Sequence, residues 1–165
     1  MLVLEKIISF FMSILMALFP NVFLQVKQER DNDFNLWAPK IIEAIKEEDV
    51  EALESMMCLN IRQNVENLHE EIQNFYDCIE GEIIDAYGEK DLSWVHDDGT
   101  HSMQYGYSIY LTTDKHEYEI GGVWELYNTI NPEETKIRVI TLVLCDEPSY
   151  AVYSISDVED ELGWH

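Results

Sequence analysis

Three alternating segments between residues 102 and 147 constrain the fold of this chain most strongly. In residues 102–113 every second side chain is apolar or aromatic: Met103, Tyr105, Tyr107, Ile109 and Leu111. Residues 116–127 repeat the pattern with Tyr118, Ile120, Gly122, Trp124 and Leu126. Residues 136–145 (KIRVITLVLC) become apolar on both faces, as in a central strand. Since alternate side chains of a strand share a face, these segments predict consecutive strands of an antiparallel sheet.

The connections between these segments contain weaker turn signals than the segments contain strand signals. Asp114-Lys115 lies at hairpin spacing but lacks the glycine typical of tight hairpins. Asn131-Pro132 predicts the next turn. Gly121-Gly122 interrupts the middle segment, and paired glycines inside a strand predict a bulge or bend that curves the sheet.

Helical periodicity dominates the part of the chain before the strands. Residues 35–48 carry Trp37, Ile41 and Ile45 at four-residue steps. Asp49 is the expected cap of a short second helix that ends near Met57. The third helix is expected to run unbroken over residues 61–79, with Asn60 as its cap and Gly81 just past its end. Its apolar stripe consists of Ile61, Val65, Leu68, Ile72, Phe75 and Ile79.

Helices that precede an antiparallel sheet indicate the α+β class. A first strand is expected over residues 82–87, and Trp94-Val95 resumes β-structure, so the sheet has about four strands. One long helix on such a curved sheet resembles the NTF2-like, or cystatin-like, cone. The predicted organisation is a domain over residues 34–147 and an acidic tail over residues 148–165. The tail is expected either to add an edge strand or to cover a cavity mouth.

Residues 1–26 are strongly apolar, and residues 27–33 read as a polar tether. Ile7–Phe19 matches the core of an export signal, and extension to Val26 makes the segment long enough to cross a bilayer. We therefore expect attachment to the cell membrane, with the domain outside the cytoplasm. The alternative is a buried helix of the domain.

The formal net charge of the chain is −23. Nucleic acid is therefore excluded as a partner, because phosphate binding needs a basic surface. A basic protein, a cation or plain solubility remain as explanations. The three cysteines, Cys58, Cys78 and Cys145, fit no zinc spacing. They are either buried thiols or, for Cys58 and Cys78, a pair between neighbouring helices.

Four pieces of the chain resemble an uncharacterised bacterial family, the domain of unknown function DUF5104. They are Ile41–Met57 (IIEAIKEEDVEALESMM), Gly81–Ala86 (GEIIDA), Tyr110–Tyr118 (YLTTDKHEY) and Ile137–Leu142 (IRVITL). The resemblance implies an NTF2-like fold and export as a lipoprotein, and it implies no activity. This chain departs from the family pattern in lacking a lipoprotein cysteine near its amino terminus.

Potential ligand side chains are densest at His96-Asp97-Asp98, with His101 nearby. Adjacent loop residues rarely converge on one ion, and His69-Glu70-Glu71 lacks the second histidine of a zinc-protease helix, so neither a metal site nor a cofactor is predicted. The expected ligand-binding residues are aromatic: Trp94, Tyr105, Tyr107 and Trp124. They are predicted to line a cavity for a small apolar or sugar-like ligand. The alternative is that these rings fill the core.

Three functional hypotheses follow. The first is a membrane-attached or exported binding module without enzymatic activity. The second is an acidic immunity or inhibitor protein against a basic partner, favoured by the charge. The third is an NTF2-like enzyme with Asp85, His96 or His101 as a general base, which must face the cavity.

Overall fold

The structure, a computed structural model, describes residues 20–97, 102–132, 135–146 and 149–156. The contacts divide the chain into two units, Met1–Asn35 and Leu36–His165. The boundary falls inside helix α2 (Pro20–Lys46), which also contains the residues predicted as a tether. None of the described helices is long and apolar enough to cross a membrane. Most of the predicted anchor, residues 1–19, lies outside the described part of the chain.

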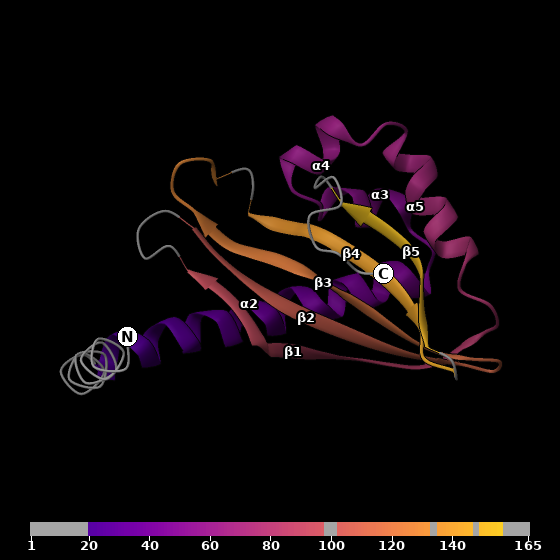
Figure 1. Cartoon of the computed structure of the whole chain (residues 1–165), viewed down its shortest axis with the longest axis horizontal. Helices are drawn as coiled ribbons and strands as arrows, with labels where there is room; N and C mark the ends of the chain where they lie inside the picture. Colours follow the sequence, from indigo (N-terminus) through magenta and orange to yellow (C-terminus); the bar gives the residue numbers. More distant parts are fainter. Residues whose placement is uncertain (1–19, 98–101, 133–134, 147–148, 157–165) are drawn as a thin grey trace, which may run out of the picture. The chain divides into compact units, whose positions relative to one another are not determined.

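Three short helices follow α2, and the first is capped as predicted (Figure 1). The Asp49 carboxylate accepts a hydrogen bond from the Ala52 amide at 2.9 Å at the start of α3 (Val50–Ser55). Helix α4 spans Leu59–Asn64 and helix α5 spans Leu68–Asp77. At the N-cap of α3, Asp49 thus accepts a hydrogen bond from one of the amides that the first turn of a helix leaves without a backbone partner.

The predicted long third helix is wrong, because the chain breaks between α4 and α5. Val65 has an extended backbone, with ψ at 113°, and Asn67 is left-handed, with φ at 54°. A β-branched valine disfavours the helix, and asparagine tolerates the left-handed region better than most residues. Asn60 lies inside α4, and Cys58 occupies the N-cap position, where its side chain makes no capping hydrogen bond.

The break preserves most of the burial that the periodicity predicts. Ile61 from α4 and Leu68, Ile72 and Phe75 from α5 are all buried. Val65 and Ile79, the other two members of the predicted stripe, are only half-buried. The apolar stripe thus identifies most of these core residues, although it gives the wrong helix length.

Five strands form one antiparallel sheet in the order β1-β2-β3-β4-β5. Their bounds are β1 Ile83–Asp97, β2 Ser102–Thr113, β3 Glu117–Asn128, β4 Lys136–Leu144 and β5 Tyr150–Ser156. The predicted α+β class is confirmed, and the expected number of about four strands is wrong. The fifth strand comes from the predicted tail, which pairs with β4 as an edge strand.

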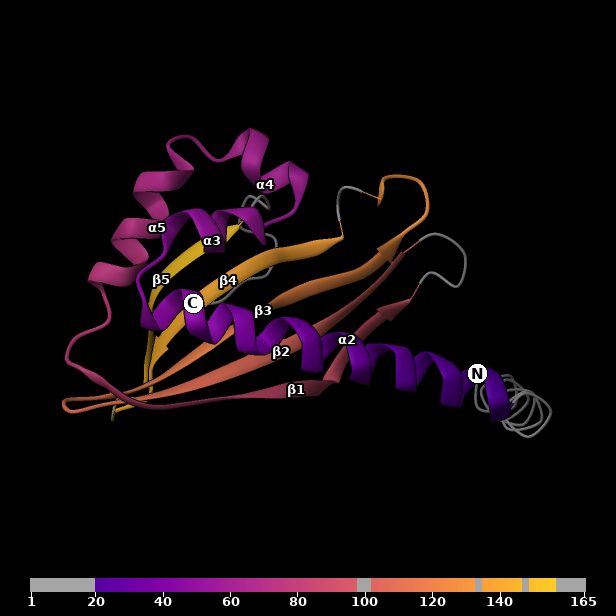
Figure 2. The same ribbon diagram turned by 180° about the vertical axis from the view of Figure 1, so that it is seen from behind.

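The two faces of the sheet differ in burial. The inner face is buried, and its members include Tyr105, Tyr107, Ile109, Leu111, Tyr118, Ile120, Trp124, Ile140 and Leu142. The outer face presents exposed Tyr87 and Glu89 and half-exposed Ser108, Tyr110 and Glu119. Figure 2 shows the carboxyl-terminal part of α2 running across the strands. This part, from Leu36 onward, contributes Trp37 to the inner face.

Two further contacts fix the shorter helices on the sheet. Tyr153 of β5 donates a hydrogen bond to Glu71 of α5. Where β4 extends past its pairing with β5, the segment between α3 and α4 forms a parallel bridge with β4. There the Cys58 amide donates to the Ile137 carbonyl at 2.9 Å, and the Ile137 amide donates to the Met56 carbonyl at 3.1 Å.

Candidate functional site

Three of the four predicted ligand-binding residues meet on the inner face. Tyr105 pairs with Trp124 across β2 and β3, and Tyr107 pairs with Gly122. Tyr105 and Tyr107 are each 1% exposed, and Trp124 is 8% exposed. The backbone of Trp94 lies in β1, but its side chain lies outside the described residues.

Trp37 of α2 completes this group, which we call the aromatic cluster. Its ring stacks on Trp124 with centroids 4.0 Å apart and meets Tyr107 edge-on at 5.0 Å. Its indole Nε1 donates a hydrogen bond of 2.9 Å to the Tyr105 hydroxyl. Stacked and edge-to-face rings at these distances are favourable contacts. The sequence indicated Trp37 only as a member of the apolar stripe of residues 35–48, and not as a partner of the sheet aromatics.

Gly122 makes room for one of these rings. A Cβ atom at this position would collide with the Val139 carbonyl and lie 2.6 Å from the Tyr107 ring. The buried Tyr107 hydroxyl donates to that same carbonyl at 3.4 Å. Burial raises the pKa of Tyr107 well above its ordinary value, so the phenol stays protonated. The space that the missing side chain of Gly122 leaves is therefore filled by the Tyr107 ring.

The two cavities described next are lined by none of the aromatic cluster. The first, the end cavity, has a volume of about 340 Å³. It lies between the last turn of α2, the end of α5 and the start of β1. Ile45, Ile79 and Ile83 form its apolar walls, and Glu48 and Glu82 are its acidic lining residues.

The last turn of α2 gives Glu48 an unusual backbone. The Asp49 amide donates to the Ala44 carbonyl at 2.8 Å, and the Glu48 amide donates to the Ile45 carbonyl at 3.3 Å. This pattern is a Schellman motif, which places its C′ residue in the left-handed region and usually uses glycine there. Glu48 occupies that position with φ at 51°. A carboxylate is thus held at the negative end of the helix dipole.

Tyr76 of α5 also lines the end cavity. Its hydroxyl donates to the Asp49 carbonyl at 3.1 Å. Burial, followed by the negative charges of Asp49 and Glu48, raises its pKa well above the ordinary value.

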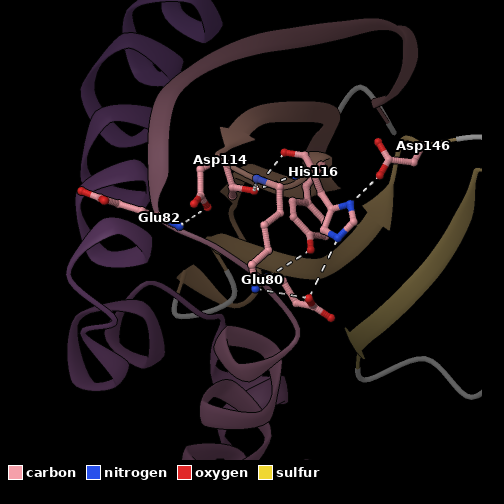
Figure 3. Close-up of polar contacts among 8 residues, drawn as sticks. Glu80, Glu82, Asp114, His116 and Asp146 are labelled. Carbon is pink, nitrogen blue, oxygen red and sulfur yellow. Dashed lines mark hydrogen bonds and ion pairs between the residues drawn. The ribbon is translucent and has the colours of Figure 1, made fainter.

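The hairpin between β2 and β3 borders this region. Its His116 meets Glu80, which lies between α5 and β1, and Asp146, which follows β4 (Figure 3). We call these three residues the hairpin clamp. His116 Nδ1 lies 2.5 Å from Asp146 Oδ2, and its Nε2 lies 4.0 Å from Glu80 Oε2. The Thr113 hydroxyl accepts hydrogen bonds from the Lys115 and His116 amides, at 3.2 and 2.9 Å. This side chain stabilises the predicted turn, which has no glycine.

The second cavity, the outer hollow, has a volume of about 310 Å³ and lies on the outer face of the sheet. Its lining residues are Glu89, Lys90, Ser108, Tyr110 and Glu119. A Cβ at nearby Gly121 would meet nothing within 4 Å, so the face is open there. The Ser108 hydroxyl donates to Glu119 Oε1 at 2.6 Å and holds that carboxylate in place.

A buried carboxylate was missed by the sequence analysis. Glu125 of β3 is fully buried and pairs with Arg138 at 3.1 Å. Gln104 and Asn128 also donate to it, at 3.1 and 2.8 Å. Four groups that satisfy one another form a structural network. Nothing in the alternation distinguishes Glu125 from its exposed neighbours on the same strand.

The remaining predicted groups are Asp85, the acidic and histidine residues 96–101, and the three cysteines. Asp85 is exposed, and its carboxylate accepts a hydrogen bond from the Ala86 amide. The side chains of His96 and Asp97, and the whole of Asp98 and His101, lie outside the described residues. Among the described residues there is no group of side chains suited to a metal ion. Cys58, Cys78 and Cys145 form no disulfide, so the alternative of a Cys58–Cys78 pair is wrong.

Comparison with known proteins identifies the family of the chain. No curated protein is similar to the chain. The sequence model of DUF5104, a domain of unknown function, matches residues 40–157, which include α3 to α5 and all five strands. Because the match spans well over half of the sequence, the chain belongs to the DUF5104 family.

Proposed function

We propose that this chain is a membrane-attached, non-enzymatic binding module whose outer sheet face docks a basic segment of a partner protein. The observation that carries the proposal is the outer hollow, where Tyr110 and two carboxylates line a solvent-facing part of the sheet and Tyr87 stacks on Tyr110 beside them. Residues 1–26 supply the attachment, and the helices and curved sheet form an NTF2-like cone. The order of helices and meander strands supports that assignment.

The aromatic pair supplies a surface for a cationic side chain. Tyr87 and Tyr110 are cross-strand neighbours with ring centroids 5.1 Å apart, and Tyr87 is 51% exposed. Burial and the nearby Glu119 charge raise the pKa of Tyr110, so its hydroxyl stays protonated and can donate. An arginine or lysine over such a ring gains about 0.5–1 kcal/mol at an exposed site.

The carboxylates give the face its preference for positive charge. Glu89 and Glu119 flank the hollow, and Lys90 is the basic residue of its lining. The net charge of −23 adds a long-range attraction for basic partners. Arginine suits this face best, because its guanidinium can stack on a ring and bind a carboxylate at once.

The test is the affinity of the full chain for an arginine–glycine peptide, measured by fluorescence anisotropy at several salt concentrations. Glu119→Gln keeps the acceptor for Ser108 and removes only the charge. We expect it to weaken binding about threefold to fivefold, since exposed pairs contribute about 1 kcal/mol or less. Glu66→Gln is the control, because Glu66 is exposed in the turn before α5, away from the hollow. Equal affinity in both variants contradicts the outer hollow as the docking site.

A further inference from the structure

The outer edge of β1 lies beside the outer hollow and ends the sheet. Among the described residues β1 pairs only with β2, so its other side is an open strand edge (Figure 1). We propose that the basic segment docks as an added antiparallel strand on this edge, with alternate arginines beside Tyr87 and Glu89. This inference rests on the proposed function, because the same outer face receives the arginines.

The hydrogen bonds of β2 show which backbone groups of β1 point away from the sheet. The Thr113 amide donates to the His116 carbonyl at 2.8 Å, on the β3 side. Since alternate residues of an antiparallel strand bond to the same side, Leu111 also faces β3. Its partner on β1, Ala86, therefore directs its amide and carbonyl away from β2. Gly88, two residues farther along β1, does the same.

Gly88 offers a complete pairing position on this edge. The Ala86 amide is already bonded to the Asp85 carboxylate, at 2.9 Å. In the part of the chain that the structure describes, the outward amide and carbonyl of Gly88 have no partner. An antiparallel strand exchanges two hydrogen bonds with one residue at such a position, and a glycine lets another backbone approach closely.

The faces of β1 determine which side chains an added strand should have. A residue opposite Gly88 joins the inner side, and its two neighbours lie on the outer face, opposite Tyr87 and Glu89. Tyr87 and Glu89 are both exposed, and the Tyr87 ring stacks on Tyr110. An arginine in these outer positions can lie on the exposed ring and bind the carboxylate. The matching strand therefore alternates arginine with apolar residues.

Charge favours a basic strand over a second copy of this chain. Two copies that pair through β1 each have a net charge of −23 and repel one another. Within residues 83–90 the charged side chains are Asp85, Glu89 and Lys90, so the edge itself is acidic. A strand with alternate arginines meets this edge with the opposite charge.

The experiment compares three short peptides of alternating valine and arginine, whose binding to the full chain is measured by fluorescence anisotropy. The first is unmodified, the second is N-methylated at its valines and the third at its arginines. With the arginines on the outer face, the valine amides point to β1 and the arginine amides point to solvent. Methylation of the valines should therefore weaken binding about tenfold, and methylation of the arginines should change it little. All three peptides have the same charge.

A second measurement follows β1 directly by amide hydrogen exchange. The Gly88 amide should exchange about tenfold more slowly in the presence of saturating unmodified peptide. The Tyr87 amide is the internal control, because it already faces β2 and should change little. An unchanged Gly88 amide in the complex contradicts pairing at this edge.

The outcomes separate strand addition from docking in general. Equal effects of the two methylations, or a loss with methylated arginines alone, overturn strand addition. If the unmodified peptide still binds and Glu119→Gln weakens it, docking on the outer face stands without strand addition. An unmodified peptide that does not bind overturns strand addition, and failure of the arginine–glycine peptide as well contradicts the proposed function itself.

Discussion

At the scale of single residues, two neighbouring glycines of β3 are predicted to differ in their tolerance of the same change to alanine. Gly122→Ala introduces a Cβ against the Val139 carbonyl and the Tyr107 ring, so we expect a loss of about 2–3 kcal/mol in unfolding free energy. Gly121→Ala enters open space and should change stability by less than about 1 kcal/mol in either direction. Urea unfolding measures both. Similar losses in the two variants would show that Tyr107 does not occupy the space beside Gly122.

The same residues show how far the sequence alone leads. Alternation places Tyr105, Tyr107 and Trp124 on one buried face, and the structure confirms that placement. Alternation carries no information on which helix covers the face, so the stacking of Trp37 on Trp124 was not predictable. The prediction that these rings bind a ligand is untested, and the contacts among them account for their burial without one.

At the scale of elements, the strands were easier to predict than the helices. Period-two patterns depend on one face being buried, and β2 and β3 match their predicted ranges closely. The break after α4 depends on the backbone of Val65 and Asn67, which an apolar stripe does not record. The end cavity and the outer hollow are formed by residues far apart in the sequence, so no local pattern contains them.

The end of α2 gives a prediction at this scale. Glu48→Gly removes the left-handed strain of a residue with a Cβ and an unfavourable charge at the helix end. Glycine also costs conformational entropy on folding, so we expect a net stabilisation of about 1 kcal/mol. Thermal melts monitored by circular dichroism test this, with Glu47→Gly as the control. Since Glu47 lies inside the hydrogen-bonded end of the helix, glycine there should destabilise. A lower melting temperature for Glu48→Gly would contradict the Schellman geometry.

At the scale of the whole molecule, the net charge and the charge of the outer hollow agree in sign. Acidic residues exceed basic ones by 23, and the outer hollow is lined by two carboxylates and one lysine. Attraction between exposed charges more than about 8 Å apart is largely screened at physiological salt. Binding of a basic peptide to the outer hollow should therefore weaken as salt is added.

The attachment of the molecule to a membrane is tested by removing residues 1–26. The deletion leaves the whole Leu36–His165 unit, with its sheet and α3 to α5, in place. We therefore expect the truncated chain to keep a cooperative thermal melt, because the contacts of the sheet and of the aromatic cluster all lie within that unit. In cell fractionation, the full chain should sediment with membranes and the truncated chain should stay in the supernatant. A full chain in the supernatant would contradict membrane attachment. A truncated chain without a cooperative melt would instead show that residues 1–26 belong to the folded core, as the alternative of a buried helix requires.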